Sequence, residues 1–223
     1  MVVAAGRGER AGEGIPKQFR PLAGVPLLLH ALRPFLSHPA VHTVVAVLPP
    51  DAAAQPPEWL AGLLGERLLT APGGAERMDS VEAGLGVLPP ACQIVLVHDG
   101  ARPFPDTSVI DAVISAARRG SGAIAAIPLS DTLKASESVG ASVRVSGTVD
   151  RTGLWRAQTP QGFPRATLEA AYRKARADRF RGTDESELVE RNGGTVILIP
   201  DTTRNLKVTT PDDFLMAEAL ARR

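Results

Sequence analysis

The chain has 223 residues, of which 44% are hydrophobic and 22% are charged, and its formal net charge at pH 7 is +1. This composition supports a folded core and excludes a wholly disordered chain, and the near-neutral balance argues against a general nucleic-acid binder. The sequence shows neither a signal peptide nor the ~20 consecutive apolar residues of a membrane span, so we expect a cytoplasmic protein. Its single cysteine, Cys92, cannot form an internal disulfide, and we expect it to be buried.

Five short apolar runs are predicted to be β-strands. They are nearly continuous in Val, Ile, Leu and Ala, which is typical of parallel strands that are buried on both faces. In chain order they are Val2–Ala5, Thr43–Leu48, Gln93–Val97, Ala123–Leu129 and Thr195–Ile199.

Helical patterns separate these strands. At the end of the chain, Thr210 is a capping residue, Pro211 suits the first helical position, and two acidic residues follow in the first turn. The alternation predicts a single α/β domain over residues 1–223, with an open, mostly parallel, Rossmann-like sheet and helices on both faces. Such sheets bind ligands beyond the carboxyl ends of their strands. The other predicted helices are Pro26–Leu36, Glu76–Leu88, Thr107–Arg118 and Asp184–Arg191, the last capped by Thr183.

Residues 130–155 interrupt this alternation. Their short alternating stretches, such as S-V-R-V-S at 142–146, predict an antiparallel β-arm that leaves the sheet. Val143, Val145 and Val149 give the arm an apolar side that needs cover, and a partner subunit is one candidate.

The first strand leads into a loop rich in glycine and cations. Its sequence is A-A-G-R-G-E-R, followed by P-K-Q, and it matches neither a Walker A loop nor G-x-G-x-x-G. Glycines such as Gly6 and Gly8 let backbone N–H groups approach phosphate oxygens, and Arg10 and Lys17 can flank a transferring phosphorus. The loop therefore predicts a phosphate site.

Further polar motifs follow in a distinctive order. They are G-G-A-E-R-M-D-S at 73–80, H-D-G-A-R-P at 98–103, T-V-D-R-T-G-L-W at 148–155, T-P-Q at 159–161, T-D-E at 183–185 and N-L-K-V-T at 205–209. Together with the opening loop, these motifs resemble the 2-C-methyl-D-erythritol 4-phosphate cytidylyltransferases, which have the nucleotide-diphospho-sugar transferase type of fold. The resemblance runs from Val2 to about Glu218.

The resemblance implies transfer of CMP from CTP to 2-C-methyl-D-erythritol 4-phosphate, with pyrophosphate released, in the non-mevalonate isoprenoid pathway. It implies a divalent cation, Mg²⁺, held mainly by the CTP phosphates near Asp99. It also implies a homodimer that pairs through the β-arm, with some arm residues acting in the neighbouring subunit's site. The residues implied for nucleotide binding are Ala4, Ala5, Gly6, Gly8, Gly74, Ala75, Ser80, Asp99 and Gly100.

The same resemblance implies the catalytic and polyol-binding residues. Arg10 and Lys17 would stabilise charge on the α-phosphate, and Arg151 and Lys207 would hold and aim the attacking phosphate. In-line attack by a phosphate oxygen needs positioning and cations rather than a general base. The residues implied for substrate binding are Arg102, Thr132, Arg151, Thr159, Thr183 and Lys207.

Other interpretations stay open at this point. Ribitol-5-phosphate cytidylyltransferases share the CTP half of the site, sugar-1-phosphate nucleotidyltransferases are more distant, and a non-catalytic nucleotide-binding module could use the same fold. Arg10, Lys17 and Lys207 together argue against a silent module. Asp99, Arg151, Thr159 and Thr183 also have structural interpretations, and we expect His98 to be a packed residue rather than a base or a ligand.

Overall fold

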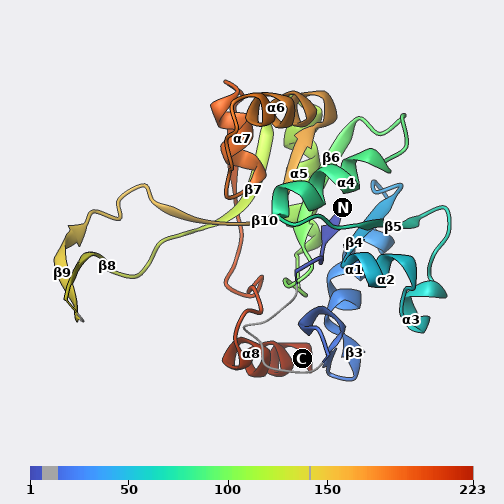
Figure 1. Cartoon of the computed structure of the whole chain (residues 1–223), viewed down its shortest axis with the longest axis horizontal. Coiled ribbons are helices and arrows are strands. Elements are labelled where there is room, and N and C mark those ends of the chain that lie inside the picture. The colour runs from blue at the N-terminus through green and yellow to red at the C-terminus, as the bar shows by residue number, and fades with distance from the viewer. Residues whose placement is uncertain (7–14, 141, 223) are drawn as a thin grey trace.

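The computed structural model describes residues 1–6, 15–140 and 142–222. Its centre is a seven-stranded sheet with the strand order β11-β7-β10-β6-β1-β4-β5 (Figure 1). Every neighbouring pair is parallel except the two that involve β10, so the predicted mostly parallel sheet is confirmed. The strands are β1 (Val2–Val3), β4 (Val44–Leu48), β5 (Leu68–Pro72), β6 (Ile94–Asp99), β7 (Gly122–Pro128), β10 (Trp155–Pro164) and β11 (Val196–Pro200).

The five predicted strands are all present in this sheet, but β5 and β10 were not predicted. β10 is antiparallel to both β6 and β7, with Gly162 opposite Leu96 on one side and Ala123 on the other. Its sequence, W-R-A-Q-T-P-Q-G-F-P, alternates poorly because Gln158, Thr159 and Gln161 are buried and bond to other segments of the chain.

The predicted helices are also present, together with three that the sequence pattern did not indicate, namely α2, α3 and α6. One predicted cap is wrong: α7 begins at Glu185, and its N-cap is Asp184, whose carboxylate accepts the Glu187 N–H at 3.0 Å. Thr183 instead donates its hydroxyl to the Glu187 carboxylate. The helices are α1 (Leu27–Ser37), α2 (Pro50–Ala54), α3 (Glu58–Ala61), α4 (Arg77–Gly86), α5 (Thr107–Arg118), α6 (Arg165–Ala177), α7 (Glu185–Arg191) and α8 (Pro211–Ala221).

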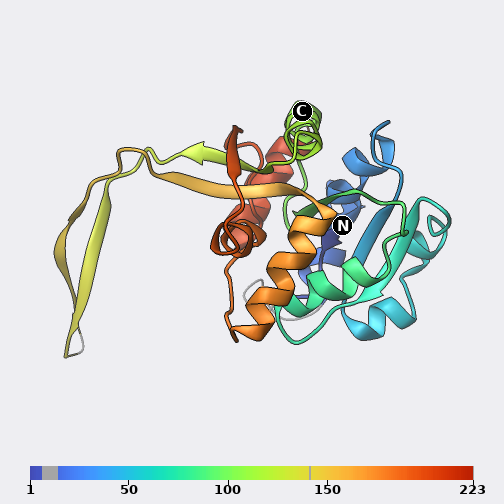
Figure 2. The same cartoon turned by 90° about the horizontal axis from the view of Figure 1, so that it is seen from above.

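Helices cover both faces of the sheet (Figures 1 and 2). Side chains of a strand alternate between faces, and β4 follows this rule. Val45 and Val47 pack in the core that includes α4, α6 and α7. Val44 and Ala46 pack in the core that includes α1 and α5. The near-continuous apolar run of β4 is therefore explained by burial on both sides.

A separate small core lies beside the carboxyl ends of the strands. It joins α8 to the hairpin of β2 (Pro21–Leu22) and β3 (Val25–Pro26), which directly follows the 3-10 helix η2 (Lys17–Phe19). Leu22 and Leu27 pack there against Val208 and Ala217. This packing holds the segment that carries Lys17 close to the segment that carries Lys207.

The arm is an antiparallel hairpin of β8 (Leu133–Val139) and β9 (Ser142–Val149), as predicted. It projects away from the rest of the chain in both views (Figures 1 and 2). Val143 is 75% exposed and Val145 is 59% exposed, so the apolar side of the arm is open in a single chain.

The single cysteine of the chain was expected to be buried. Cys92 is half-buried rather than buried, and its thiol donates to the Ile94 carbonyl at 3.2 Å.

Within the part of the chain that the structure describes, no helix is both long and apolar enough to cross a membrane.

We predict that Gly162→Ala destabilises the fold by about 1–3 kcal/mol, the usual cost of overpacking. A Cβ at this position of β10 would lie 2.4 Å from Val113 Cγ1 of α5, and this helix would have to shift. Gly147→Ala on the arm is the matched control, because its Cβ would meet nothing within 4 Å. Urea denaturation measures both variants, and an equal free energy of unfolding for the two would contradict the close packing.

Candidate active site

A pocket of about 240 Å³ lies at the carboxyl ends of β1 and β6, where the fold class predicts a ligand site. Three of its side chains are cationic (Lys17, Arg77 and Lys207) and two are anionic (Glu76 and Asp99). The lining is completed by Val3, Ala4, Ala5, Gly6, Gln18, Gly74, Ala75, Ser80, Gly100 and Ala101.

A larger cavity of about 410 Å³ lies at the opposite, amino ends of β4 and β6. Its lining is mostly apolar and includes Phe35, Val44, Ile94 and Ile114, with Arg118 and His42 as its basic residues. A triphosphate needs several cations and close backbone N–H groups, so the smaller pocket is the candidate active site.

Glycines bring three backbone segments of the pocket into close contact. A Cβ at Gly73 would lie 2.1 Å from the Ala5 Cβ, and a Cβ at Gly100 would lie 2.8 Å from the Ala4 Cβ. A Cβ at Gly74 would lie 2.2 Å from the Asp79 Cβ. The pocket wall can therefore form only where these side chains are missing, which explains the glycines of both motifs.

Ser80 holds the glycine turn before α4. Its hydroxyl donates to the Glu76 carbonyl at 3.0 Å and accepts the Gly74 N–H at 3.2 Å. The capping box of α4, formed by Glu76 and Asp79, fixes the same turn. The turn is thus preorganised beside the pocket.

Gln18 fixes the backbone that follows the first strand. Its buried amide donates to the carbonyls of Ala4 and Gly6, at 3.0 and 3.2 Å. Its neighbour Lys17 donates to the Val208 carbonyl at 3.0 Å, which joins η2 to the segment before α8. The P-K-Q motif therefore sets the position of a predicted catalytic lysine.

Asp99 is the buried carboxylate of the pocket, at the end of β6. Burial raises its pKa, but Lys207, Arg77 and Arg102 outweigh this effect and hold the pKa below the ordinary value. Its Oδ2 lies 2.9 Å from Lys207 Nζ and 3.6 Å from Arg102 Nε. Asp99 is therefore ionised at neutral pH, and it positions the cations around it.

His98 is held neutral behind this carboxylate. Burial lowers its pKa to about 4. The Arg102 carbonyl, 2.9 Å from Nε2, can only accept, so Nε2 carries the proton and Nδ1 accepts from the Thr159 hydroxyl at 3.0 Å. Thr159 in turn accepts the Asp99 N–H at 3.0 Å. His98 is a packed residue, as predicted, and Thr159 aligns the end of β6.

Asn205 fastens the segment that carries Lys207. Its buried amide donates to the Thr159 carbonyl at 2.8 Å and to Asp201 Oδ2 at 2.6 Å. Its own carbonyl accepts from Arg102 at 2.6 Å and from Gln158 at 3.1 Å. This network attaches residues 201–208 to β10 and to the segment after β6.

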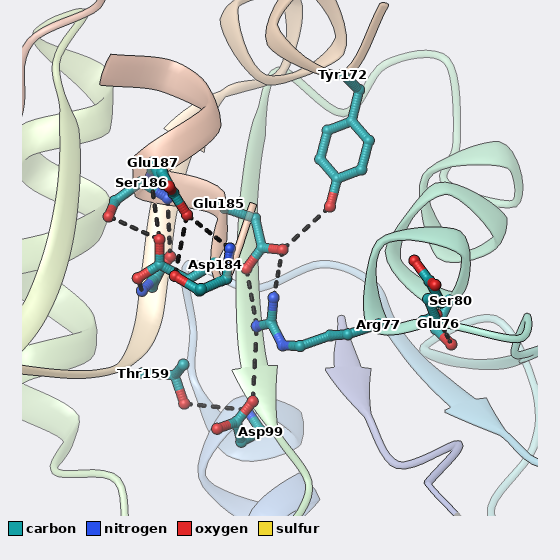
Figure 3. Close-up of polar contacts among 12 residues, drawn as sticks. Glu76, Arg77, Ser80, Asp99, Thr159, Tyr172, Asp184, Glu185, Ser186 and Glu187 are labelled. Carbon is teal, nitrogen blue, oxygen red and sulfur yellow. Dashed lines mark hydrogen bonds and ion pairs between the residues drawn. The ribbon is translucent and has the colours of Figure 1, made fainter. Parts of the chain in front are cut away.

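Arg77 is a pocket residue to which the sequence motifs assigned no role (Figure 3). Its guanidinium makes two hydrogen bonds to Glu185, at 2.6 and 2.9 Å, and lies 3.6 Å from Asp99 Oδ1. Glu185 is fully buried and also accepts the Tyr172 hydroxyl at 3.0 Å. Burial alone would lower the pKa of Arg77, but the Glu185 carboxylate outweighs this effect and raises it. The pKa of Tyr172 is raised mainly by burial and then by Glu185.

The structure brings together most of the predicted nucleotide site but not all of the predicted substrate site. Gly8 and Arg10 lie outside the described residues. Arg102, Thr159 and Thr183, together with the exposed Thr132 and Arg151, are not among the described residues that line the pocket. The predicted nucleotide residues that line it are Ala4, Ala5, Gly6, Gly74, Ala75, Ser80, Asp99 and Gly100, and they are joined by Lys17 and Lys207.

The described part of the pocket has two carboxylates, Glu76 and Asp99, that could contact a metal ion. No group of three or more His, Cys, Asp or Glu side chains arranged for metal binding occurs in the described ranges. The pocket carboxylate Asp99 provides an oxygen ligand of the kind that Mg²⁺ prefers. This fits an ion that is bound mainly by the phosphates of a nucleotide.

Comparison with known proteins decides the family. The family model of 2-C-methyl-D-erythritol 4-phosphate cytidylyltransferase matches residues 1–223. The chain belongs to this family. A relative of that name from Streptomyces coelicolor is 45% identical over 231 residues, covering 100% of this chain and 84% of the relative. A relative of that name from Syntrophus aciditrophicus is 38% identical over 229 residues, covering 100% of this chain and 95% of the relative.

A solved structure supports the same assignment. The 2-C-methyl-D-erythritol 4-phosphate cytidylyltransferase of Thermus thermophilus has a TM-score of 0.82 and 34% identity, over 100% of this chain and 98% of that one. The predicted family, fold and cytidylyltransferase activity are confirmed. The roles of single residues, the metal and the dimer stay predictions.

Proposed function

We propose that this chain transfers CMP from CTP to 2-C-methyl-D-erythritol 4-phosphate and releases pyrophosphate, as the names of its family and relatives imply. The observation that carries the proposal is the pocket at the ends of β1 and β6. It combines close-packed glycine turns with Lys17 and Lys207, which suits a nucleotide triphosphate.

The reaction balances without a general base. A phosphate oxygen of the polyol phosphate attacks the α-phosphorus of CTP, the new P–O bond forms, and the bond to the β-phosphate oxygen breaks as pyrophosphate leaves in line. The attacking oxygen is already anionic, so no proton has to be removed. This agrees with a pocket beside which His98 is buried and neutral.

Cationic side chains of the chain lower the barrier. Both reactants are strongly anionic, so their repulsion has to be offset where charge develops. Lys17 is held at the pocket by its bond to the Val208 carbonyl, and Lys207 by its pair with Asp99. Mg²⁺, when bound, neutralises part of the triphosphate charge, and Asp99 is the side chain we assign to it.

The polyol half of the site is proposed to be completed by a second copy of the chain. Thr132 directly precedes β8 and Arg151 follows β9, so the two residues flank the arm hairpin in the sequence. Both are exposed, and neither lines the pocket of its own chain. The open apolar side of the arm needs cover, and an identical chain would provide it. The arm would then bring these residues to the neighbouring pocket.

The proposed function is tested by pyrophosphate release from CTP and Mg²⁺, with 2-C-methyl-D-erythritol 4-phosphate and D-ribitol 5-phosphate in parallel. We expect release with the first substrate. Release with D-ribitol 5-phosphate alone would mean that D-ribitol 5-phosphate is the substrate, and the proposed mechanism would still apply. Binding of CTP without release with either substrate would mean a nucleotide-binding module instead.

We predict that Lys17→Ala lowers kcat by about 10²–10³, the cost of losing one preorganised charge-stabilising donor. We expect the same of Arg10→Ala, on the resemblance alone. The matched control is Lys174→Ala on α6, where the lysine pairs with Asp178 at 3.2 Å. Steady-state kinetics at saturating CTP measure all three variants, and a loss below roughly threefold for Lys17→Ala would refute its role, since it is far below the loss of such a donor.

We predict that the wild-type chain is a dimer, with a mass near twice the 23.4 kDa of one chain. The double variant Val143→Asp/Val145→Asp places charge on the apolar side of the arm and should give a monomer with impaired transfer. Arg144→Asp, on the other side of the same strand, should remain a dimer. Multi-angle light scattering at micromolar concentration distinguishes these results, and a monomeric wild type would exclude the arm as the dimer contact.

A further inference from the structure

Arg77 occupies a position that is unfavourable for a cation unless it has partners. It is the first residue of α4, and the positive end of the helix dipole repels a guanidinium there. Its side chain is only 30% exposed although it lines the pocket. The structure supplies two carboxylates to it, Glu185 and Asp99, from elements far apart in the sequence.

Both terminal nitrogens of Arg77 are committed to these carboxylates (Figure 3). One lies 2.6 Å from Glu185 Oε1, and the other lies 2.9 Å from Glu185 Oε2 and 3.6 Å from Asp99 Oδ1. The bidentate edge formed by these two nitrogens is therefore occupied by the Glu185 carboxylate. Arg77 is therefore suited to position other groups.

Arg77 connects the nucleotide pocket to a fixed point on α7. Its backbone continues the turn of Gly74 to Glu76, which lines the nucleotide pocket. Glu185 is the first residue of α7, directly after the N-cap Asp184. Glu185 is fully buried and is also bonded by Tyr172 of α6, so it is a fixed point for the guanidinium.

We propose that Arg77 is a positioning residue that, held by Glu185, sets the orientation of Asp99 and of the glycine turn before CTP binds. The inference rests on the proposed function only in that the pocket is taken to bind CTP. Arg77 faces Asp99 Oδ1, and Lys207 and Arg102 face Oδ2, so each oxygen has its own cationic partner. Losing one partner would let the carboxylate rotate away from its aligned orientation.

The shape of the guanidinium is essential to this role. A lysine at position 77 would keep the charge that compensates buried Glu185, but a compact ammonium cannot reach two carboxylates through a planar fork. Arg77→Lys therefore separates orientation from charge. Glu185→Gln performs the converse change, because it keeps the shape of the side chain and removes the charge that fixes Arg77.

The experiment measures CTP affinity by calorimetry in the presence of Mg²⁺, then KM and kcat for both substrates, with a thermal melt of each variant. We expect Arg77→Lys to weaken CTP binding about tenfold, the low end of what supporting residues contribute at metal sites. The KM for the polyol phosphate should change less than about twofold, since Arg77 acts on the nucleotide side. Glu185→Gln should weaken CTP binding similarly, and the double variant should lose little more than either single variant, because the two residues act as one unit.

Arg176→Lys is the matched control. Arg176 of α6 pairs with Asp79 and Glu82 of the same helix α4, but it is exposed and outside the pocket. Its replacement should leave CTP affinity unchanged, so an equal loss in this variant would mean that any loosening of α4 suffices and would overturn the proposal. Unchanged CTP affinity in folded Arg77→Lys would also overturn it. If Arg77→Lys does not fold, Glu185→Gln carries the same test.

The calorimetric measurement keeps this inference separate from the proposed function. A wild-type chain that binds CTP but releases no pyrophosphate would refute the transferase proposal, whereas a tenfold weaker affinity of Arg77→Lys would still support Arg77 as a positioning residue.

Discussion

The site depends on one buried carboxylate that gathers cations from three separate segments. Burial alone would favour the neutral form of Asp99, but Lys207, Arg77 and Arg102 surround it and keep it ionised. These cations come from the segment before α8, from α4 and from the segment after β6, and without Asp99 they would repel one another. The pocket lining carries three cations, Lys17, Arg77 and Lys207, against two carboxylates, Glu76 and Asp99, and this positive excess attracts a triphosphate.

Whether a strand of this fold could be predicted from the sequence depends on what its side chains contact. β4 was recognisable because it is apolar on both faces, and its burial decides its composition. β10 was not, because Gln158, Thr159 and Gln161 bond to Asn205, Asp99 and Asp184, which lie far away in the sequence. In the sequence, a buried polar residue whose hydrogen bonds are made inside the fold cannot be distinguished from one that faces water. Hydrophobic periodicity could therefore not reveal an internal strand there.

The same distinction separates the predicted and the missed parts of the site. The glycine-rich loop after the first strand is a local signal that predicted a phosphate site, and the family resemblance carried by the ordered motifs implied most of the pocket lining. Arg77 and Glu185 are 108 residues apart, and neither indicates its partner locally. Two weaker signals were available: Arg77 opposes the dipole of its own helix, and Glu185 shares helical spacing with the buried Leu188 and Val189. A charge in each unfavourable position implies that a partner exists, without identifying it.

The proposed division of the site between two chains has a physical consequence for catalysis. Most of the predicted nucleotide site lies within one chain, since its glycine turns, Asp99, Lys17 and Lys207 line a single pocket. The arm residues proposed for the polyol phosphate are exposed and do not line the pocket of their own chain. A site built in this way can bind CTP in each chain independently, but it can aim the attacking phosphate only when a second chain has docked. Positioning contributes mainly to the transfer step, so assembly would govern turnover more strongly than nucleotide affinity.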